Sequence, residues 1–227
     1  MTRMKIFCDF DGTITTTDNI ISLMKKFAPP EWNAIKDSIL NQRVSIKKGV
    51  SEMFLLLPAS LRDELVQYLL DTHQLRPGFN DFIEWTRQQN IDLKIVSGGI
   101  DFFVEPILEG LLPRNQVYCN SADFTGDTIK ITWPHPCDEF CDNECGCCKT
   151  SIIRQEAQPE DFIVMIGDSI TDLEGAKLAD LVFACDEYLA DKCRELGLNY
   201  RYFDTFHEVI EGLQEINRKA GTYGQLS

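Results

Sequence analysis

Short runs of almost uninterrupted apolar residues recur along the chain, separated by segments with helical periodicity. A strand that is apolar throughout is buried on both faces, as in a parallel sheet covered by helices. The predicted strands span residues 5–10, 92–98, 162–168, 181–185 and 200–203. The helices predicted among them span residues 77–90, 149–158, 171–179 and 205–220. This alternation predicts an α/β fold with a doubly wound parallel sheet.

Residues 15–75 break the alternation, because they contain no convincing strand. Four helical patterns, punctuated by prolines, fill this region: residues 19–27, 30–40, 45–57 and 60–71. We therefore predict a helical module, residues 15–75, inserted into a core formed by residues 1–14 and 76–227. Within the core, residues 117–134 alternate around a Thr-Gly-Asp turn and predict a β-hairpin. A cysteine-rich loop, residues 137–148, follows the hairpin.

The chain is acidic, with 36 acidic and 22 basic residues and a net charge of −14. Such a surface repels phosphate backbones, so we expect no nucleic-acid partner. A small anionic substrate would need a bound cation or local hydrogen-bond donors to offset the negative potential of the protein at its site. We see no secretory pattern or membrane-spanning stretch and expect a cytoplasmic protein with no membrane partner. Its nine cysteines should then be mostly reduced, and nothing in the sequence indicates an oligomeric state.

Two aspartates, Asp9 and Asp11, follow the first apolar run in the order Asp-Phe-Asp-Gly-Thr. Extended chain alternates sides, so both carboxylates point the same way. They lie at the carboxyl end of a strand, where open α/β folds bind their ligands. Two close carboxylates repel each other unless a cation separates them or one keeps a proton. The pattern predicts either a catalytic pair or a plain turn at Asp11-Gly12 with Asp9 as a cap.

A second acidic pair, Asp168 and Asp172, follows another predicted strand and opens a helix. Mg²⁺ takes oxygen ligands from a few carboxylates, so this pair and Asp9 together indicate a metal site. Helix capping would explain Ser169 or Thr171. It would not explain acidic residues after two separate strands.

Two further features are weak signals when each is taken alone. Ser97-Gly98-Gly99 follows a predicted strand, and its hydroxyl and backbone N–H groups could cradle a phosphoryl group or form an ordinary turn. Lys149 opens a predicted helix, where a lone lysine is usually a solvated charge. A site that holds several aspartates and a phosphate would nevertheless need such a cation.

In order and context, these residues resemble the motifs of the haloacid dehalogenase superfamily: Asp-x-Asp-x-Thr, a Ser or Thr, a Lys, and Gly-Asp-x-x-x-Asp. The resemblance implies a Rossmann-like core with a C1-type helical cap. It also implies a Mg²⁺-dependent phosphatase that acts on a small phosphorylated metabolite.

The same resemblance implies a role for each site residue. Asp9 would attack phosphorus and form an aspartyl-phosphate, and Asp11 would act as general acid and then general base. Ser97 and Lys149 would hold the phosphoryl oxygens. Further phosphate or substrate contacts would come from Thr13, Gly98 and Gly99. Mg²⁺ would bind Asp9, Asp168 and the backbone carbonyl of Asp11. Asp172 would either bind the ion as well or lie just behind the residues that do.

The helical insert stands where the family places the cap that selects the substrate. The arrangement resembles phosphoserine phosphatases, in which a cap glutamate and a cap arginine bind the substrate amine and carboxylate. Those positions fall near Asp18 and Met53 here. A thioether cannot pair with a carboxylate but suits an apolar or sulfur-bearing tail. Alternatively, Met53 only fills the core of the cap.

The chain more closely resembles a narrower branch, the 2-hydroxy-3-keto-5-methylthiopentenyl-1-phosphate phosphatases of methionine salvage. This likeness rests on residues 8–15, 18–21, 27–32, 97–104 and 137–149. It implies hydrolysis of an enol phosphate to a methylthio acireductone. Two alternatives remain: a phosphatase for another small metabolite, such as phosphoserine, phosphocholine or phosphoethanolamine, or a non-catalytic, zinc-stabilised binding protein on the same scaffold.

Five cysteines crowd into twelve residues before Lys149: Cys137, Cys141, Cys145, Cys147 and Cys148. Steps of four would stack the first three on one helix face. Alternatively, four of the five could wrap a tetrahedral Zn²⁺, although the usual two-residue spacing is missing. A compact reduced loop that positions Lys149, or disulfides formed on oxidation, are further alternatives.

Overall fold

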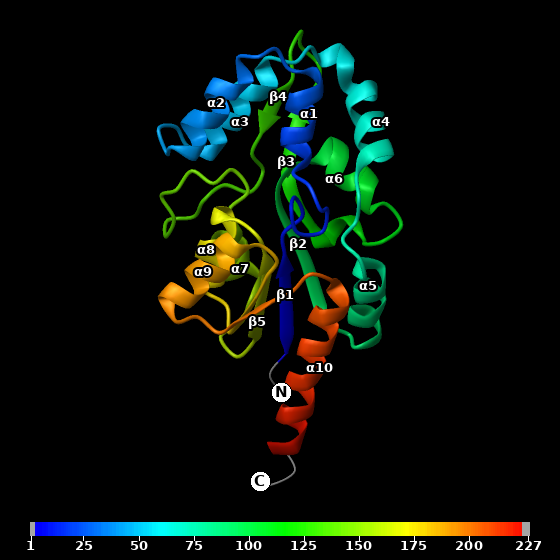
Figure 1. Cartoon of the computed structure of the whole chain (residues 1–227), viewed down its shortest axis with the longest axis vertical. Coiled ribbons are helices and arrows are strands. Elements are labelled where there is room, and N and C mark those ends of the chain that lie inside the picture. The colour runs from blue at the N-terminus through cyan, green and yellow to red at the C-terminus, as the bar shows by residue number, and fades with distance from the viewer. Residues whose placement is uncertain (1–2, 224–227) are drawn as a thin grey trace.

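The computed structural model describes residues 3–223, and a seven-stranded sheet in the order β4-β3-β2-β1-β5-β6-β7 forms its centre (Figure 1). Six strands are parallel, and β4 alone runs antiparallel, beside β3. This confirms the predicted α/β fold. The strands are β1 (Met4–Cys8), β2 (Asp92–Ile100), β3 (Val117–Asp123), β4 (Lys130–Thr132), β5 (Phe162–Gly167), β6 (Leu181–Ala184) and β7 (Tyr200–Tyr202).

Helices cover both faces of the sheet, which explains why its central strands β1, β5 and β6 are almost uninterrupted apolar runs. Successive side chains of β1 point to opposite faces, so Ile6 and Cys8 pack into one apolar cluster and Phe7 into another. The first face is covered by α5 (Phe79–Gln88), α6 (Asp101–Leu108) and α10 (Phe206–Tyr223). The second is covered by α7 (Lys149–Glu156), α8 (Ile170–Ala176) and α9 (Glu187–Leu196).

The helical insert stands over the carboxyl ends of the strands and is called the cap below (Figure 1). An antiparallel bridge between Thr15 and Leu75 joins the two chain crossings at its base. The Arg76 guanidinium strengthens this junction by donating to the carbonyls of Gly12 (2.7 Å) and Thr13 (2.8 Å). The cap contains α1 (Asn19–Phe27), α2 (Trp32–Leu40), α3 (Ile46–Leu55) and α4 (Arg62–Thr72), with a short 3₁₀ turn (Ala59–Leu61).

The predicted hairpin is present as β3 and β4, and its tip reaches the cap. Pro58 and Thr128 form an antiparallel bridge, and the Ile129 N–H donates to the Leu57 carbonyl at 3.1 Å. The hairpin therefore ties the cap to the sheet independently of the two chain crossings.

Two helices, α6 and α9, do not appear among the sequence predictions. Helix α6 carries apolar side chains on most of its surface, and these pack against both the sheet and the cap helix α4. A helix buried all round shows no amphipathic period, so periodicity does not reveal it. Within the described residues, no helix is long and apolar enough to cross a membrane.

Candidate active site

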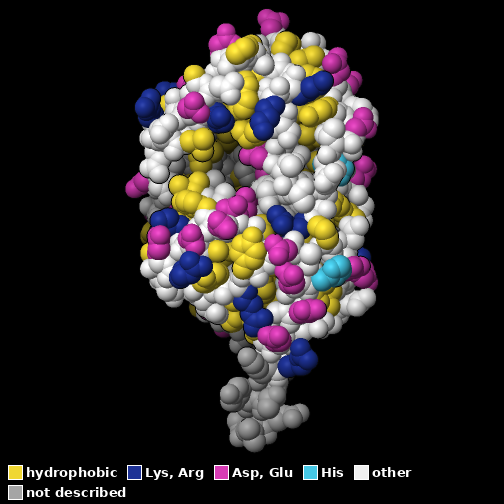
Figure 2. Space-filling view, viewed as in Figure 1, with side chains coloured by type: hydrophobic (Ala, Val, Ile, Leu, Met, Phe, Trp, Pro, Cys, Tyr) yellow, Lys and Arg dark blue, Asp and Glu magenta, His cyan; other side chains and the backbone are white. Residues whose placement is uncertain are grey.

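The two aspartates after β1 line one cavity between the cap and the sheet. The Asp9 N–H donates to the Ile166 carbonyl at 2.9 Å, which extends the pairing of β1 with β5 by one residue. Phe10 is fully buried on the opposite side, against Phe103. Asp9 and Asp11 therefore face a cavity of about 260 Å³. Figure 2 shows a hollow there, with acidic side chains at its edge.

Lys149 is buried beneath the site rather than solvated. Its ammonium lies 2.7 Å from Asp9 Oδ1, contacts Asp172 Oδ1, and lies 3.3 Å from the Thr171 hydroxyl. Burial opposes the charge on Lys149, but the carboxylates of Asp172 and Asp9 outweigh it and raise the pKa of the lysine. Lys149 thus brings a buried positive charge to the carboxylates of Asp9 and Asp172.

Asp168 and Asp172 flank the turn between β5 and α8. The fully buried Asp172 accepts from the backbone N–H groups of Asp168 and Ser169, each at 3.0 Å, through Oδ2. It forms a capping box with Ser169, so the capping alternative is correct for Ser169. Because Oδ1 of Asp172 faces Lys149, this side chain orients both the turn and the lysine.

Asp9, Asp168 and Asp172 each place one carboxylate oxygen within 4.8 Å of the others. Burial and the neighbouring carboxylates raise the pKa of Asp9 to about 6 and that of Asp168 to about 9. Such a set gains stability from a divalent cation that separates the charges. Both oxygens of Asp172 already have donors, so Asp9 and Asp168 have the more available oxygens for a metal.

Gly12 gives Asp168 the room to approach Asp9. Its φ of +80° lies in the left-handed region, and a Cβ at this position would lie 2.3 Å from Asp168 Oδ2. Any larger residue would therefore be strained and would push the carboxylate away from the cluster.

Asp11 is held by Asn19, the first residue of the cap helix α1. The Asn19 backbone N–H and side-chain amide both donate to Asp11 Oδ1, at 3.0 and 2.6 Å. Burial and the charge of Asp18 raise the pKa of Asp11 well above its usual range. With both donors on Oδ1, a proton on this acid resides on Oδ2. Asp11 is thus arranged as a proton donor.

The remaining core residues predicted for phosphate binding lie around this centre. Ser97 is buried near the carboxyl end of β2, and its hydroxyl oxygen accepts from the Gly99 N–H at 2.9 Å. Gly98 lines the cavity. A Cβ on Gly99 would lie 2.7 Å from Asp11 Oδ2. Thr13 is fully buried, and its hydroxyl donates to Asp168 Oδ1 at 3.2 Å. The structure therefore brings Thr13 to the acidic cluster rather than to the cavity wall.

The cap supplies an apolar wall to the same cavity. Met53 lies on α3, is 2% exposed, and lines the cavity opposite the aspartates. Asp18 also lines it, while one of its oxygens accepts from the Ile21 N–H and caps α1. The other apolar lining residues of the cap include Ile20, Ile21, Ile39, Ile46 and Val50. A larger hollow of about 800 Å³ lies between α4 and α6, but none of the predicted site residues lines it.

Sequence reasoning missed Asn19 and Arg76 as supports of the site. Asn19 reads as a helix start, and Arg76 reads as a surface charge after the cap. Their partners lie 8 and 63–64 positions away, so neither contact has a local sequence signal. Their roles become visible only from their partners: the Asp11 carboxylate for Asn19, and the carbonyls of Gly12 and Thr13 for Arg76.

The haloacid dehalogenase-like hydrolase family model matches residues 6–177. The chain belongs to this family, which confirms the resemblance predicted from its motifs. Phosphatases of the family generally use Mg²⁺.

Two relatives and two solved structures illustrate the similarity. The chain is 55% identical over 214 residues to the 2-hydroxy-3-keto-5-methylthiopentenyl-1-phosphate phosphatase of Geobacillus kaustophilus (strain HTA426), covering 94% of this chain and 97% of the relative. It is 51% identical to the Bacillus thuringiensis (strain Al Hakam) phosphatase of the same name, with the same coverage. A substrate-bound phosphoserine phosphatase superposes with a TM-score of 0.69 at 17% identity, covering 93% and 98% of the chains. A phospho-aspartyl intermediate analogue of phosphoserine phosphatase superposes with a TM-score of 0.68 at 18% sequence identity, covering 93% of this chain and 99% of the other.

Proposed function

We propose that this protein is a Mg²⁺-dependent phosphomonoesterase that hydrolyses 2-hydroxy-3-keto-5-methylthiopentenyl-1-phosphate to the acireductone and phosphate, in methionine salvage. The observation that carries the proposal is that one side of the cavity is charged and the other is largely apolar. Its floor gathers Asp9, Asp11 and Asp168, with Lys149 behind them, and its roof is the apolar wall around Met53. A phosphoryl group suits the floor, and a methylthio tail suits the roof.

Asp9 is the nucleophile in this mechanism. The Asp9 oxygen that Lys149 leaves free attacks phosphorus, the bond to the substrate oxygen breaks, and an aspartyl-phosphate forms. Lys149 keeps Asp9 ionised and oriented, and it counters the charge that gathers on the phosphoryl oxygens. Ser97, with the backbone of Gly98, contributes donors at the same end of the sheet.

Asp11 moves the protons. Its Oδ2 proton passes to the leaving enol oxygen in the first step. In the second, the resulting carboxylate takes a proton from the water that attacks phosphorus, and the bond between phosphorus and the Asp9 oxygen breaks to release phosphate. Asn19 is a positioning residue, because it fixes Asp11 Oδ1 and so leaves Oδ2 toward the reaction. Mg²⁺, when bound by Asp9 and Asp168 with the backbone carbonyl of Asp11, would neutralise phosphoryl charge.

A screen of phosphorylated metabolites tests the assignment. The panel should contain the methionine-salvage enol phosphate, phosphoserine, phosphocholine and phosphoethanolamine. We expect the enol phosphate to give the highest kcat/KM, with phosphate release that depends on Mg²⁺. Equal or better turnover of phosphoserine would contradict the assignment, and no turnover of any member would favour a non-catalytic binding protein.

One observation favours a second candidate. The Asp18 carboxylate lines the cavity and could pair with a substrate amine, but Met53 offers no partner for a carboxylate. An amine without a carboxylate, as in phosphocholine or phosphoethanolamine, would fit this combination better than phosphoserine. One oxygen of Asp18 is already engaged in capping α1, which weakens this alternative.

The Met53→Gln substitution should separate tail recognition from chemistry. The two side chains have similar length, but an amide buried against Ile46 and Val50 loses solvation and gains no partner. We expect KM for the enol phosphate to rise about tenfold, within the range for an altered apolar pocket, with little change in kcat. Leu55→Gln, on the same helix and 46% exposed, is the matched control and should leave both constants unchanged. An unchanged KM in Met53→Gln would show that the residue only fills the cap.

Mg²⁺ should stabilise the protein more as pH rises. Asp9 and Asp168 have pKa values raised to about 6 and 9 without the metal. The folded state therefore holds protons that the unfolded state has lost, and stability falls as pH rises from about 4 toward 9. Mg²⁺ competes with those protons and should remove this loss. We expect the Mg²⁺-induced rise in Tm to grow between pH 5 and 9 and to be much smaller in Asp168→Asn. A rise independent of pH would contradict this carboxylate site.

A further inference from the structure

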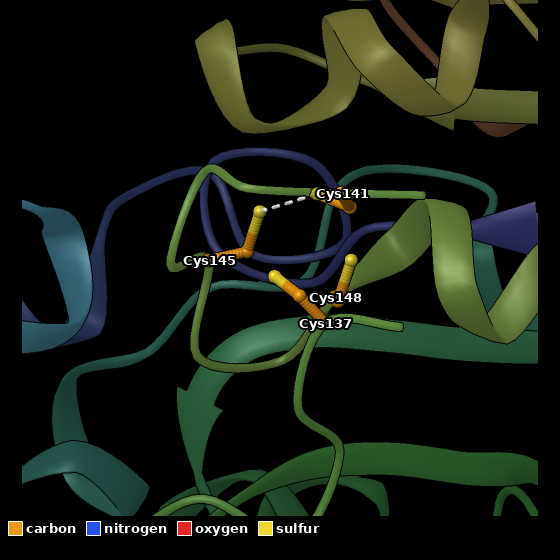
Figure 3. Close-up of side chains that lie close together, drawn as sticks. All are labelled: Cys137, Cys141, Cys145 and Cys148. Atoms are coloured by element: carbon orange, nitrogen blue, oxygen red, sulfur yellow. Dashed lines mark hydrogen bonds between the residues drawn. The ribbon is translucent and has the colours of Figure 1, made fainter. Parts of the chain in front are cut away.

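Four cysteine thiols converge beside the site, and the mechanism uses none of them. Cys137, Cys141, Cys145 and Cys148 each place Sγ within 4.8 Å of the other three. Figure 3 shows the four side chains around a shared centre: three come from the irregular loop, and Cys148 comes from the residue before α7. No helix spans the loop, so the predicted stacking of the first three on one helix face is wrong. Cys147 lies apart, buried with Phe7 and Val96.

The spacing of the sulfurs suits a tetrahedral metal site. Zn–S bonds of about 2.3 Å place the sulfurs of a tetrahedral site about 3.8 Å apart. The Sγ atoms of Cys141 and Cys145 lie 3.9 Å apart. A disulfide needs a separation of about 2.05 Å, and all nine cysteines are free thiols here. Four thiols around one centre are one of the ligand sets that structural zinc sites use.

The loop has little apolar packing to explain why its thiols meet. None of residues 137–145 is buried, and the ring of Phe140 is 73% exposed. The loop is anchored by Arg154, which pairs with Asp138 at 2.7 and 2.6 Å. That pair secures one end of the loop, whereas Cys141 and Cys145 lie beyond it.

Local charge and backbone geometry also favour a cation. Residues 137–148 contain four acidic side chains and no lysine or arginine. Gly146 turns the chain back toward α7 with a φ of +84°, and a Cβ at this position would lie 2.5 Å from the Trp133 ring. The turn brings Cys145 back to Cys148, whose sulfur accepts from the Ser151 hydroxyl at 3.0 Å. A hydroxyl that donates to a ligand sulfur is the kind of support that metal sites use.

We propose that Cys137, Cys141, Cys145 and Cys148 bind one structural Zn²⁺ as thiolates, releasing their protons on binding. The ion fastens the loop to the start of α7. Cys148 immediately precedes Lys149, whose ammonium reaches Asp9 and Asp172 through the interior. The zinc is therefore a positioning element for that lysine, and it takes no part in phosphoryl transfer.

Metal analysis of the full-length protein tests the site directly. The protein is expressed with added zinc, purified under reducing conditions without chelator, and dialysed against excess Mg²⁺, which displaces zinc from the carboxylates. We expect about one zinc per chain. Replacement by Co²⁺ should give the intense thiolate-to-metal absorption and visible bands of a tetrahedral sulfur site. Cys141→Ala should bind zinc at least about 100-fold more weakly, a larger loss than removal of a supporting hydrogen bond causes.

Cys147→Ala is the matched control, because Cys147 lies in the same segment but outside the cluster. It should keep the zinc and the cobalt spectrum. A zinc-selective chelator in excess Mg²⁺ should lower the Tm of the unsubstituted protein and of Cys147→Ala, but not that of Cys141→Ala. Absence of zinc and of cobalt–thiolate absorption would overturn the proposal. So would fewer than nine reactive thiols in the denatured, chelator-treated protein, because that result would show disulfides instead.

Discussion

Replacement of Asp9 by Asn should reduce kcat/KM by on the order of 10⁴-fold or more, because an amide cannot attack phosphorus. The fold should survive. The Asn oxygen can still accept from Lys149, and the substitution removes a negative charge that Asp168 and Asp172 repel. The fold raises the pKa of Asp9 to about 6, so ionising this carboxylate costs more free energy in the fold than in the unfolded chain. This cost to stability develops from about pH 4 and is complete above about pH 6. We therefore expect an unchanged or higher Tm at pH 8 without Mg²⁺.

Detection of the covalent adduct and comparison with further variants test whether Asp9 is the nucleophile. Rapid quench and mass spectrometry should detect the aspartyl-phosphate on the peptide with Asp9 in the unsubstituted protein, and no adduct in Asp9→Asn. Asp9→Ala guards against deamidation of the new Asn. Asp11→Asn should also be nearly inactive, but it keeps the nucleophile and should still form a small amount of adduct with a good leaving group. Full Mg²⁺-dependent activity in Asp9→Asn would show that the covalent mechanism is wrong.

Replacement of Lys149 by Met should damage both stability and activity. Met fills similar volume but leaves Asp9 and Asp172 without their buried cation. Breaking a buried ion pair by removing one partner costs about 3–5 kcal/mol, or roughly 6–20 °C in Tm for a chain of this size. Activity should fall by about 10²–10³-fold, because Lys149 balances charge in the transition state.

The pH dependence distinguishes lost charge from lost packing. Lys149 lowers the pKa of Asp9 against the raising effect of burial, so without the lysine the Asp9 carboxylate holds its proton still more tightly in the fold than in the unfolded chain. The stability deficit should therefore grow as pH rises above about 4. Adding Asp172→Asn should restore part of the stability but not the activity. Lys177→Met removes an exposed lysine that pairs with Glu174 and should change stability by less than about 1 kcal/mol. A Lys149→Met deficit that is constant between pH 5 and 9 would contradict the assigned role.

The sequence predicts most of the elements because their signals are local. The central strands β1, β5 and β6 are nearly continuous apolar runs, and α1 occupies residues 19–27, as its helical pattern predicts. The hairpin is present as the alternation around residues 125–127 predicts. Helix α6 escaped prediction because five of its eight residues are buried apolar side chains, which leave no clear amphipathic period. The sequence could not show which of the five clustered cysteines meet. The turn at Gly146 decides this, because it places Cys147 apart from the other four.

The sequence by itself determined the chemistry available at the sheet edge: Asp9, Asp11, Ser97, Lys149 and Asp168 in a fixed order, in an α/β chain with a helical insert. Only the tertiary structure decided how those groups act on one another. Thr13 meets Asp168, Asn19 fixes Asp11, and Lys149 connects Asp9 to Asp172. The physical reason is distance along the chain. Propensity and periodicity describe neighbours in sequence, whereas burial and charge pairing depend on residues that loops and parallel crossovers bring together from 8 to 155 positions apart.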